Sequence, residues 1–219
     1  MDPRLDGRLA VCIAASHAWY ADVFALHDIA TATDHGLWRA LAAPPPLHSA
    51  AKTLAPAVRT AEVVAAVAPY DVCSVADSFG DLDLAPHGFE VLIEATWLLH
   101  DALEATPMPA GWGPVRDREA LATWVGLHGT PGVLPDPVLG HPRFTVLAGR
   151  DGAGAVVHDA RAAVTVAHVF GDVPVTERLH LAAALHPGLP VSDYAAGTAV
   201  DESLAAGFVA LGPQLVWAR

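Results

Sequence analysis

The residues of this chain best suited to acid–base chemistry stand at or near the ends of short apolar runs. In α/β proteins, binding and catalytic sites usually form where strands end. A carboxylate, imidazole, hydroxyl or phenol at such a place can accept or donate a proton during a reaction. The candidates that share this placement are Asp77, Ser78, His168, Asp193 and Tyr194. Two alternatives stay open: Asp77 and Asp193 could instead cap the helices that follow them, and His168 could be an ordinary residue of an alternating strand.

Other kinds of site find no support in the sequence. The twelve histidines lack the His-x-His, His-x3-His and His-Glu-x-x-His spacings that hold metals, so no metal site is predicted. No Gly-x-Ser-x-Gly elbow indicates a hydrolase. Cys12 and Cys73 lie inside apolar runs, which is typical of buried free thiols. The glycine-rich string 149–154 (GRDGAG) stands between two predicted strands, where a hairpin turn explains it better than a phosphate loop.

Composition limits the class of protein and its partners. The chain has 219 residues, of which 53% are hydrophobic and 16% charged, as expected for a soluble, well-packed globule. A formal net charge of −12 makes nucleic acid a poor partner, since few cations would neutralise phosphates. The charged segment 1–8 does not resemble a signal peptide, and the apolar run after it is broken by Ser16, His17 and Asp22. We therefore expect a cytoplasmic protein without a membrane span.

The elements that must position the candidate residues follow from periodicity and from turn signals. In the first half, the predicted elements are strand 9–15, helix 19–33 closing near Gly36, an extended loop around Pro44–Pro46, helix 53–70, strand 71–76 and strand 89–100. In the second half, they are helix 117–128, strands 144–148, 155–159 and 161–170, helix 176–185 capped by Thr176, strand 189–194, a helix starting near Asp201 and strand 208–217. Trp38, beside the prolines, is interpreted either as a wall of a ligand pocket or as part of a plain connector.

The two halves share an order of features, which suggests an internal repeat. Each has an apolar strand ending in Asp, a spacer, a Gly-Phe pair and a strand that ends near Trp. The paired features are Asp77 and Asp193, Gly88-Phe89 and Gly207-Phe208, and Trp97 and Trp217. The Pro- and Gly-rich segment 106–114 is the predicted linker, so the predicted halves are 1–105 and 115–219.

This order of elements resembles that of the GCN5-related N-acetyltransferases. The segment 144–170 is similar to the central hairpin and long strand of that family, and 191–217 to its closing strand–helix–strand. The first half resembles the rear portion of the family too, through 54–59, the strand to Asp77 and Gly88-Phe89. The resemblance implies an α/β (α+β) fold with a mixed, mostly antiparallel twisted sheet flanked by helices, in two pseudo-repeated halves.

The same resemblance implies N-acyl transfer from acetyl-CoA or another acyl-CoA. It implies a base at Asp77 or His168, with Ser78 beside it, and an acid at Tyr194. Arg59, which matches the arginine of the family's diphosphate loop, and Trp38, as a pocket wall beside the prolines, are the residues expected to bind the acyl-CoA.

The segments that should bind the diphosphate differ from the family pattern. That pattern is Arg/Gln-x-x-Gly-x-Gly/Ala, in which bare backbone amides at a helix N-terminus face the phosphates. Segment 171–177 instead carries two acids, Asp172 and Glu177, together with Pro174, which lacks an N–H. Segment 59–63 keeps the arginine but has neither glycine, and Glu62 is expected to cap the helix from within.

Two functions therefore stay open. One is a divergent acyl-CoA-dependent N-acyltransferase with altered or lost cofactor binding. The other is a non-catalytic protein of the same fold that binds a small ligand or forms an oligomer, such as a homodimer.

Overall fold

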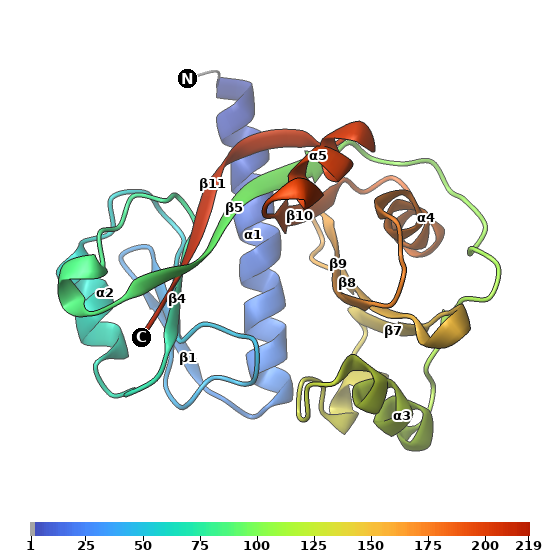
Figure 1. Cartoon of the computed structure of the whole chain (residues 1–219), viewed down its shortest axis with the longest axis horizontal. Helices are drawn as coiled ribbons and strands as arrows, with labels where there is room; N and C mark the ends of the chain where they lie inside the picture. Colours follow the sequence, from blue (N-terminus) through green and yellow to red (C-terminus); the bar gives the residue numbers. More distant parts are fainter. Residues whose placement is uncertain (1–2) are drawn as a thin grey trace.

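A computed structural model describes residues 3–219, with side chains placed from Gly7 onward (Figure 1). Its helices are α1 (Pro3–Leu26), α2 (Thr60–Val67), α3 (Arg118–His128), α4 (Val175–Leu185) and α5 (Thr198–Ala205), with short 3-10 helices η1 (Ala85–His87), η2 (Asp136–Gly140) and η3 (Arg150–Gly152). Its strands are β1 (Thr31–Asp34), β2 (Leu37–Ala40), β3 (Ala51–Thr53), β4 (Ser74–Asp77), β5 (Glu90–His100), β6 (Gly113–Pro114), β7 (Phe144–Ala148), β8 (Gly154–Asp159), β9 (Val164–Phe170), β10 (Val191–Ala195) and β11 (Val209–Ala218).

All of these strands belong to one sheet, in the order β1-β2-β3-β4-β11-β5-β10-β9-β8-β7-β6. The pairs β3–β4 and β9–β10 are parallel, and α2 and α4 respectively connect them, while the other neighbours are antiparallel. The predicted fold class, a mixed and mostly antiparallel sheet flanked by helices, is confirmed.

The last strands of the two halves are exchanged. The first half runs β1-β2-β3-α2-β4-η1-β5, and the second runs β7-β8-β9-α4-β10-α5-β11. Strand β11 lies beside β4, and β5 lies beside β10, so each half's final strand completes the sheet of the other. In Figure 1, β5 and β11 cross the middle of the molecule between the two lobes. The predicted linker 106–114 falls between β5 and β6, and the division into two related halves stays a prediction.

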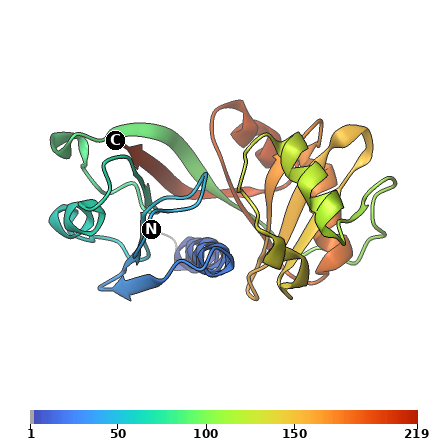
Figure 2. The same ribbon diagram turned by 90° about the horizontal axis from the view of Figure 1, so that it is seen from below.

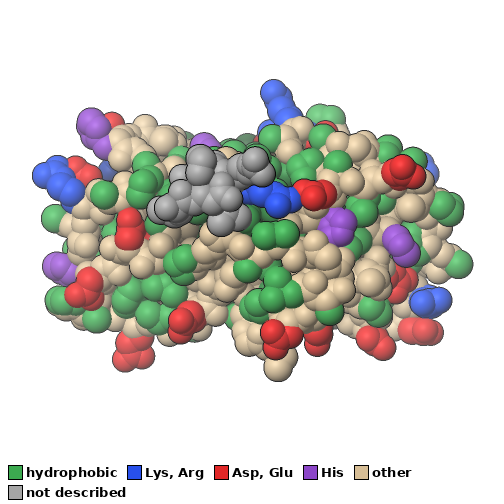
Figure 3. All heavy atoms as spheres, turned by 90° about the horizontal axis from the view of Figure 1, so that it is seen from above, with side chains coloured by type: hydrophobic (Ala, Val, Ile, Leu, Met, Phe, Trp, Pro, Cys, Tyr) green, Lys and Arg blue, Asp and Glu red, His purple; other side chains and the backbone are tan. Residues whose placement is uncertain are grey.

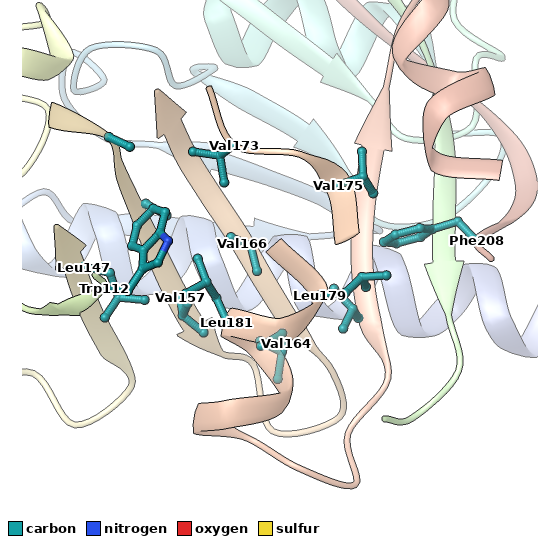
Figure 4. Close-up of a cluster of buried hydrophobic side chains, with 14 of the residues drawn as sticks. Trp112, Leu147, Val157, Val164, Val166, Val173, Val175, Leu179, Leu181 and Phe208 are labelled. Carbon is teal, nitrogen blue, oxygen red and sulfur yellow. The ribbon is translucent and has the colours of Figure 1, made fainter. Parts of the chain in front are cut away.

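Helix α1 and helix α4 cover opposite faces of the sheet. Alternate residues of a strand point to opposite faces. On β5, Trp97 and Leu99 pack against Cys12 of α1, whereas Leu98 joins the cluster that contains Leu179 of α4. Figure 2 views α1 along its axis, between the two lobes. The cluster under α4 is shown in Figure 4, where side chains of β8 and β9 meet those of α4 and Phe208.

The predicted strand 9–15 is wrong, and so is the start of the next helix at residue 19. Residues 9–15 and 19–26 belong to one helix, α1, which ends at Leu26, and residues 31–33 of the predicted helix lie in β1. Its buried residues Cys12, Ala15, Trp19 and Val23 recur every three or four positions, as one face of a helix does. A short apolar run cannot be assigned to strand or helix by its composition alone.

Helix α1 bears on the expectation of a protein without a membrane span. Segment Gly7–Leu26 is long and apolar enough to cross a membrane, and it is the one such helix found in the described part of the chain. However, 44% of the window that meets this test is buried inside the fold. The core helix of a soluble protein meets the same test, so α1 is weak evidence for a span.

Three local predictions also need correction. His35 and Gly36, at φ of 46° and 79°, form the turn of the β1–β2 hairpin and do not end a helix. The predicted helix 53–70 is shorter in the structure, where α2 covers Thr60–Val67. The first residue of the prediction, Thr53, belongs to β3. Thr176 does not cap α4: the N-cap position is Pro174, which makes no side-chain capping bond. The hairpin turn predicted at 149–154 is confirmed between β7 and β8.

Candidate functional site

A cavity lined by three of the candidate residues, His168, Asp193 and Tyr194, lies where β9 and β10 separate. These parallel strands are in register at Val164 and Val191 and then diverge. The gap contains a cavity of about 330 Å³, walled by Thr165–Val169 of β9, Ser192–Tyr194 of β10 and side chains of α1. His48, from the proline-rich loop, and Trp97, from β5, complete the wall. Five segments distant in sequence therefore meet here.

Asp193 and Tyr194 flank this gap from opposite faces of the sheet. Asp193 is opposite Leu98, which faces α4, and Tyr194 is opposite Trp97, which faces α1. The Tyr194 and Trp97 rings meet edge to face, with centroids 5.8 Å apart. A carboxyl group and a phenol thus both line one cavity, although their side chains leave β10 on opposite faces of the sheet.

The environment raises the pKa of both groups. Burial raises the pKa of Asp193 to about 6, opposed by the backbone N–H of Tyr194 and the guanidinium of Arg178. Tyr194 is 45% exposed over the whole residue, and its phenol is partly withdrawn from water. This burial raises the pKa of Tyr194, and the nearby Tyr20 and Asp193 raise it further. At neutral pH, Asp193 is therefore mainly an ionised base and Tyr194 a protonated acid.

The histidines of the cavity are weak bases. His168 has φ of 49°, and with Val169 it forms a bulge where β9 pairs with β8. Such a bulge re-aims a side chain. Burial lowers the pKa of His168 to about 3, and that of His48 to about 4. His48 accepts a hydrogen bond from Trp19 at Nε2 and contacts the Pro46 carbonyl through Nδ1, so its neutral ring is fixed in place.

Four of the residues predicted for the site lie outside the cavity. Both carboxylate oxygens of Asp77 accept backbone N–H groups of the loop that follows β4. Ser78 is buried beside it, and its carbonyl accepts a bond from the Trp97 indole. Trp38 is a core residue of β2, against Phe24. Arg59 is exposed in the other lobe.

Lys52 is the one lysine of the sequence, and it is completely buried on β3. Its Nζ lies 5.4 Å from the ring centroid of Tyr20 and 5.1 Å from that of Trp97. Within the described part of the chain, Nζ has no hydrogen-bond partner. Burial lowers the pKa of Lys52 to about 7, and only the charge of Asp77 opposes the shift. Nothing in the sequence pattern indicated that Lys52 is buried between two aromatic rings.

The first turn of α4 can present amides to an anion. Among the described residues, no side chain caps this helix. The acid expected to repel phosphate there, Glu177, instead accepts a 2.7 Å hydrogen bond from the Trp112 indole and lies 3.7 Å from Arg150. Its charge is therefore largely compensated. Asp172, in contrast, remains exposed in the loop before α4.

The corresponding turn of α2 is less suited to an anion. Glu62 was expected to cap α2 from within, but it makes no such bond and pairs with Arg59 instead. The arginine is thus already neutralised. Among residues 7–219, no three His, Cys, Asp or Glu side chains are grouped so as to hold a metal ion.

Solved structures of other proteins share this arrangement over nearly its whole length. A GCN5-related N-acetyltransferase from Kribbella flavida matches 94% of this chain and 95% of its own, with a TM-score of 0.60 and 18% sequence identity. This chain has the GCN5-related N-acetyltransferase (GNAT) fold.

Two further structures agree with the GNAT fold. A putative acetyltransferase from the GNAT family of Novosphingobium aromaticivorans DSM 12444 has a TM-score of 0.59 at 14% identity, over 86% of this chain and 89% of that one. A functionally unknown conserved protein from Staphylococcus epidermidis ATCC 12228 has a TM-score of 0.56 at 10% identity, over 88% and 94%. No protein-family model matches the sequence, and no curated protein does.

Proposed function

We propose that this chain is an acyl-CoA-dependent N-acyltransferase whose transfer step takes place between β9 and β10. The observation that supports this best is the pair Asp193 and Tyr194, a base and an acid from adjacent positions of β10 that both line one cavity. The GNAT fold, in which relatives are described as acetyltransferases, supports the same reaction class.

In this proposal the two groups move protons in opposite directions. Asp193 accepts a proton from the amine as its nitrogen bonds to the thioester carbonyl carbon. The carbon–sulfur bond then breaks, and the Tyr194 phenol gives its proton to the departing sulfur. The products are an amide and the free thiol of CoA, and Asp193 releases its proton to solvent. The apolar walls formed by Trp19 and Trp97 keep water away from the thioester.

The acyl-CoA would be held on the α4 side of the cavity. The uncapped first turn of α4 would receive the diphosphate, since backbone N–H groups at a helix N-terminus attract anions. Arg178, in the same turn, donates from Nε to the Val173 carbonyl and adds a positive charge nearby. The acyl group itself would lie between β9 and β10.

A non-catalytic scaffold of the same fold is the competing function. Asp172 remains exposed in the loop that would face the diphosphate, and Pro174 has no N–H to offer. These two residues weaken an anion site at α4. A scaffold would bind its ligand, or a second copy, without releasing a thiol.

The test combines binding with thiol release. Acetyl-CoA should raise the melting temperature, because a ligand bound to the folded state stabilises it, and mixtures with small amines should release free thiol. Asp193→Asn and Tyr194→Phe should each lower the rate about 10²- to 10⁴-fold without loss of the thermal shift. Asp201→Asn, which removes an exposed acid of α5, is the matched control. A flat thermal response to acetyl-CoA and to longer acyl-CoAs would leave only the scaffold.

A further inference from the structure

Aromatic rings line the cavity between β9 and β10 on the side of the sheet that α1 covers. They belong to Trp19, Tyr20, Trp97 and Tyr194. The first two are residues of α1, and the other two occupy paired positions of β5 and β10 that face α1. The Trp97 and Tyr194 rings meet edge to face, with centroids 5.8 Å apart. The α1 side of the cavity therefore offers a ligand the π surface of four side chains.

Two of these rings already lie against an amine of the protein itself. Nζ of Lys52 is 5.4 Å from the centroid of the Tyr20 ring and 5.1 Å from that of the Trp97 ring. Lys52 is completely buried and does not line the cavity, so it reaches these rings from the protein interior. A cation within about 6 Å of an aromatic ring centroid, over the face of the ring, is attracted by the ring quadrupole. Tyr20 and Trp97 are thus placed as cation-binding rings are.

The charges around the cavity favour a positive ligand. Asp193 is the one carboxylate among the described residues that line it. His48 and His168 stay neutral at pH 7, because burial lowers their pKa values to about 4 and about 3. The whole chain has a formal net charge of −12, and acidic side chains are spread over the face that Figure 3 shows. The field of the protein therefore attracts cations as well.

A ligand with a carboxylate or phosphate would find no cation in this cavity. None of the described residues that line it is a lysine or an arginine. Arg178, whose charge acts on Asp193, donates from Nε to the Val173 carbonyl and is not a lining residue. An acidic group placed here would lose its water beside Asp193 without a compensating charge, which costs free energy.

We propose that this cavity selects a small amine that carries one positive charge, an apolar body and no acidic group. The ammonium group lies in the gap beside Asp193, and the apolar body lies among the rings on the α1 side. The volume of about 330 Å³ is near the lower end of the range of ligand pockets, about 300–1,000 Å³, which suits a small ligand. As the acyl acceptor, this class of amine rests on the proposed acyl transfer, whereas binding of the amine needs no acyl-CoA.

Calorimetric titration of the full chain without acyl-CoA tests the recognition, with three ligands of one carbon skeleton. Phenethylamine is the cation, phenethyl alcohol is its neutral counterpart, and phenylalanine adds a carboxylate. At pH 8, Asp193 with a pKa of about 6 is ionised, and Lys52 with a pKa of about 7 is mainly neutral, while an aliphatic amine is still protonated. Phenethylamine should bind about tenfold more tightly than either other ligand. Equal affinity for the alcohol or for phenylalanine, or no binding of phenethylamine, would overturn the proposal.

Variants of β10 show whether the amine is held in this cavity. Tyr194 is 45% exposed, so Tyr194→Leu removes one ring with little disturbance of the core, and it should weaken phenethylamine binding about fivefold. Tyr194→Phe keeps the ring and should bind as the unmodified chain does. Asp193→Asn should weaken binding of the amine about tenfold and leave that of the alcohol unchanged. Asp201→Asn, at an exposed position of α5, is the matched control. Equal binding of the amine by all four variants would overturn the proposal.

Thiol release separates this inference from the acyl transfer. With acetyl-CoA, kcat/KM for phenethylamine should exceed that for phenylalanine at least about tenfold. Equal values for the two would overturn the selection of the amine and leave the acyl transfer intact. Selective binding of phenethylamine without thiol release from acetyl-CoA or longer acyl-CoAs would support the cation site and overturn the acyl transfer.

Discussion

Replacing Lys52 with methionine should stabilise the protein at neutral pH, by an amount that disappears in alkali. The amine is completely buried, and its folded-state pKa is about 7 against an ordinary value of 10.5. Between these two values the unfolded chain holds a proton that the folded chain has released. Stability of the unmodified protein therefore rises with pH across this window. Lys52→Met has a similar length and no proton to lose, so it lacks this dependence.

The magnitude follows from the two pKa values. The lowered pKa of Lys52 costs the folded state about 4 kcal/mol at pH 7, about 2 kcal/mol at pH 9 and less than about 0.5 kcal/mol at pH 10.5. The difference in free energy of unfolding between Lys52→Met and the unmodified protein should decrease by the same amounts as the pH rises. Contributions of titrating groups that do not interact with Lys52 cancel in the difference between the two proteins.

Urea unfolding of both proteins at pH 7, 8, 9 and 10 measures the effect. Arg39→Met is the matched control, because it removes an exposed cation from β2, the strand beside β3. Its difference from the unmodified protein should not change with pH. A Lys52→Met difference that is constant from pH 7 to 10, or that favours lysine throughout, would refute the reasoning. Lys52 would then be held charged by Tyr20 and Trp97.

Three other perturbations follow from the structure. Phe208→Ala should lower the free energy of unfolding by about 3–5 kcal/mol, since Phe208 is buried under α4; an unchanged urea midpoint would show it exposed. Gly154→Ala should lower the free energy of unfolding by about 1–3 kcal/mol, because the new Cβ would lie 2.3 Å from the Phe170 ring. Gly113→Ala is the control in thermal melting, since its Cβ would meet no atom within 4 Å. In the proposed reaction, kcat/KM should rise with pH through about 6 as Asp193 ionises, and a pH–rate profile that is flat from pH 5 to 8 would remove Asp193 as the base.

Sequence patterns identified the elements whose ends carry strong turn signals. Strand β7 has the predicted bounds, 144–148, because a loop and the 149–154 turn limit it on both sides. Helix α3, predicted as 117–128, starts one residue later, after Asp117, whose side chain accepts the Ala120 N–H. The run 9–15 lacked such limits, and its alanine-rich apolar composition suits either a strand or a buried helix.

The candidate site could be predicted only where a strand end carried it. His168, Asp193 and Tyr194 stand at the ends of β9 and β10, and the structure places all three around one cavity. His48 and Trp19 gave no local signal, because they reach the cavity from a loop and from α1. Their contribution depends on how the sheet is assembled, and periodicity within one segment does not contain that information.

The exchange of β5 and β11 has a consequence for synthesis of the chain on the ribosome. Among the described elements β11 is made last, and its place is between β4 and β5, which are made more than a hundred residues earlier. Until β11 has been made, β4 and β5 each present an unpaired edge, the kind of surface on which nascent chains aggregate. A chaperone that covers these edges during that interval would lower the risk of aggregation.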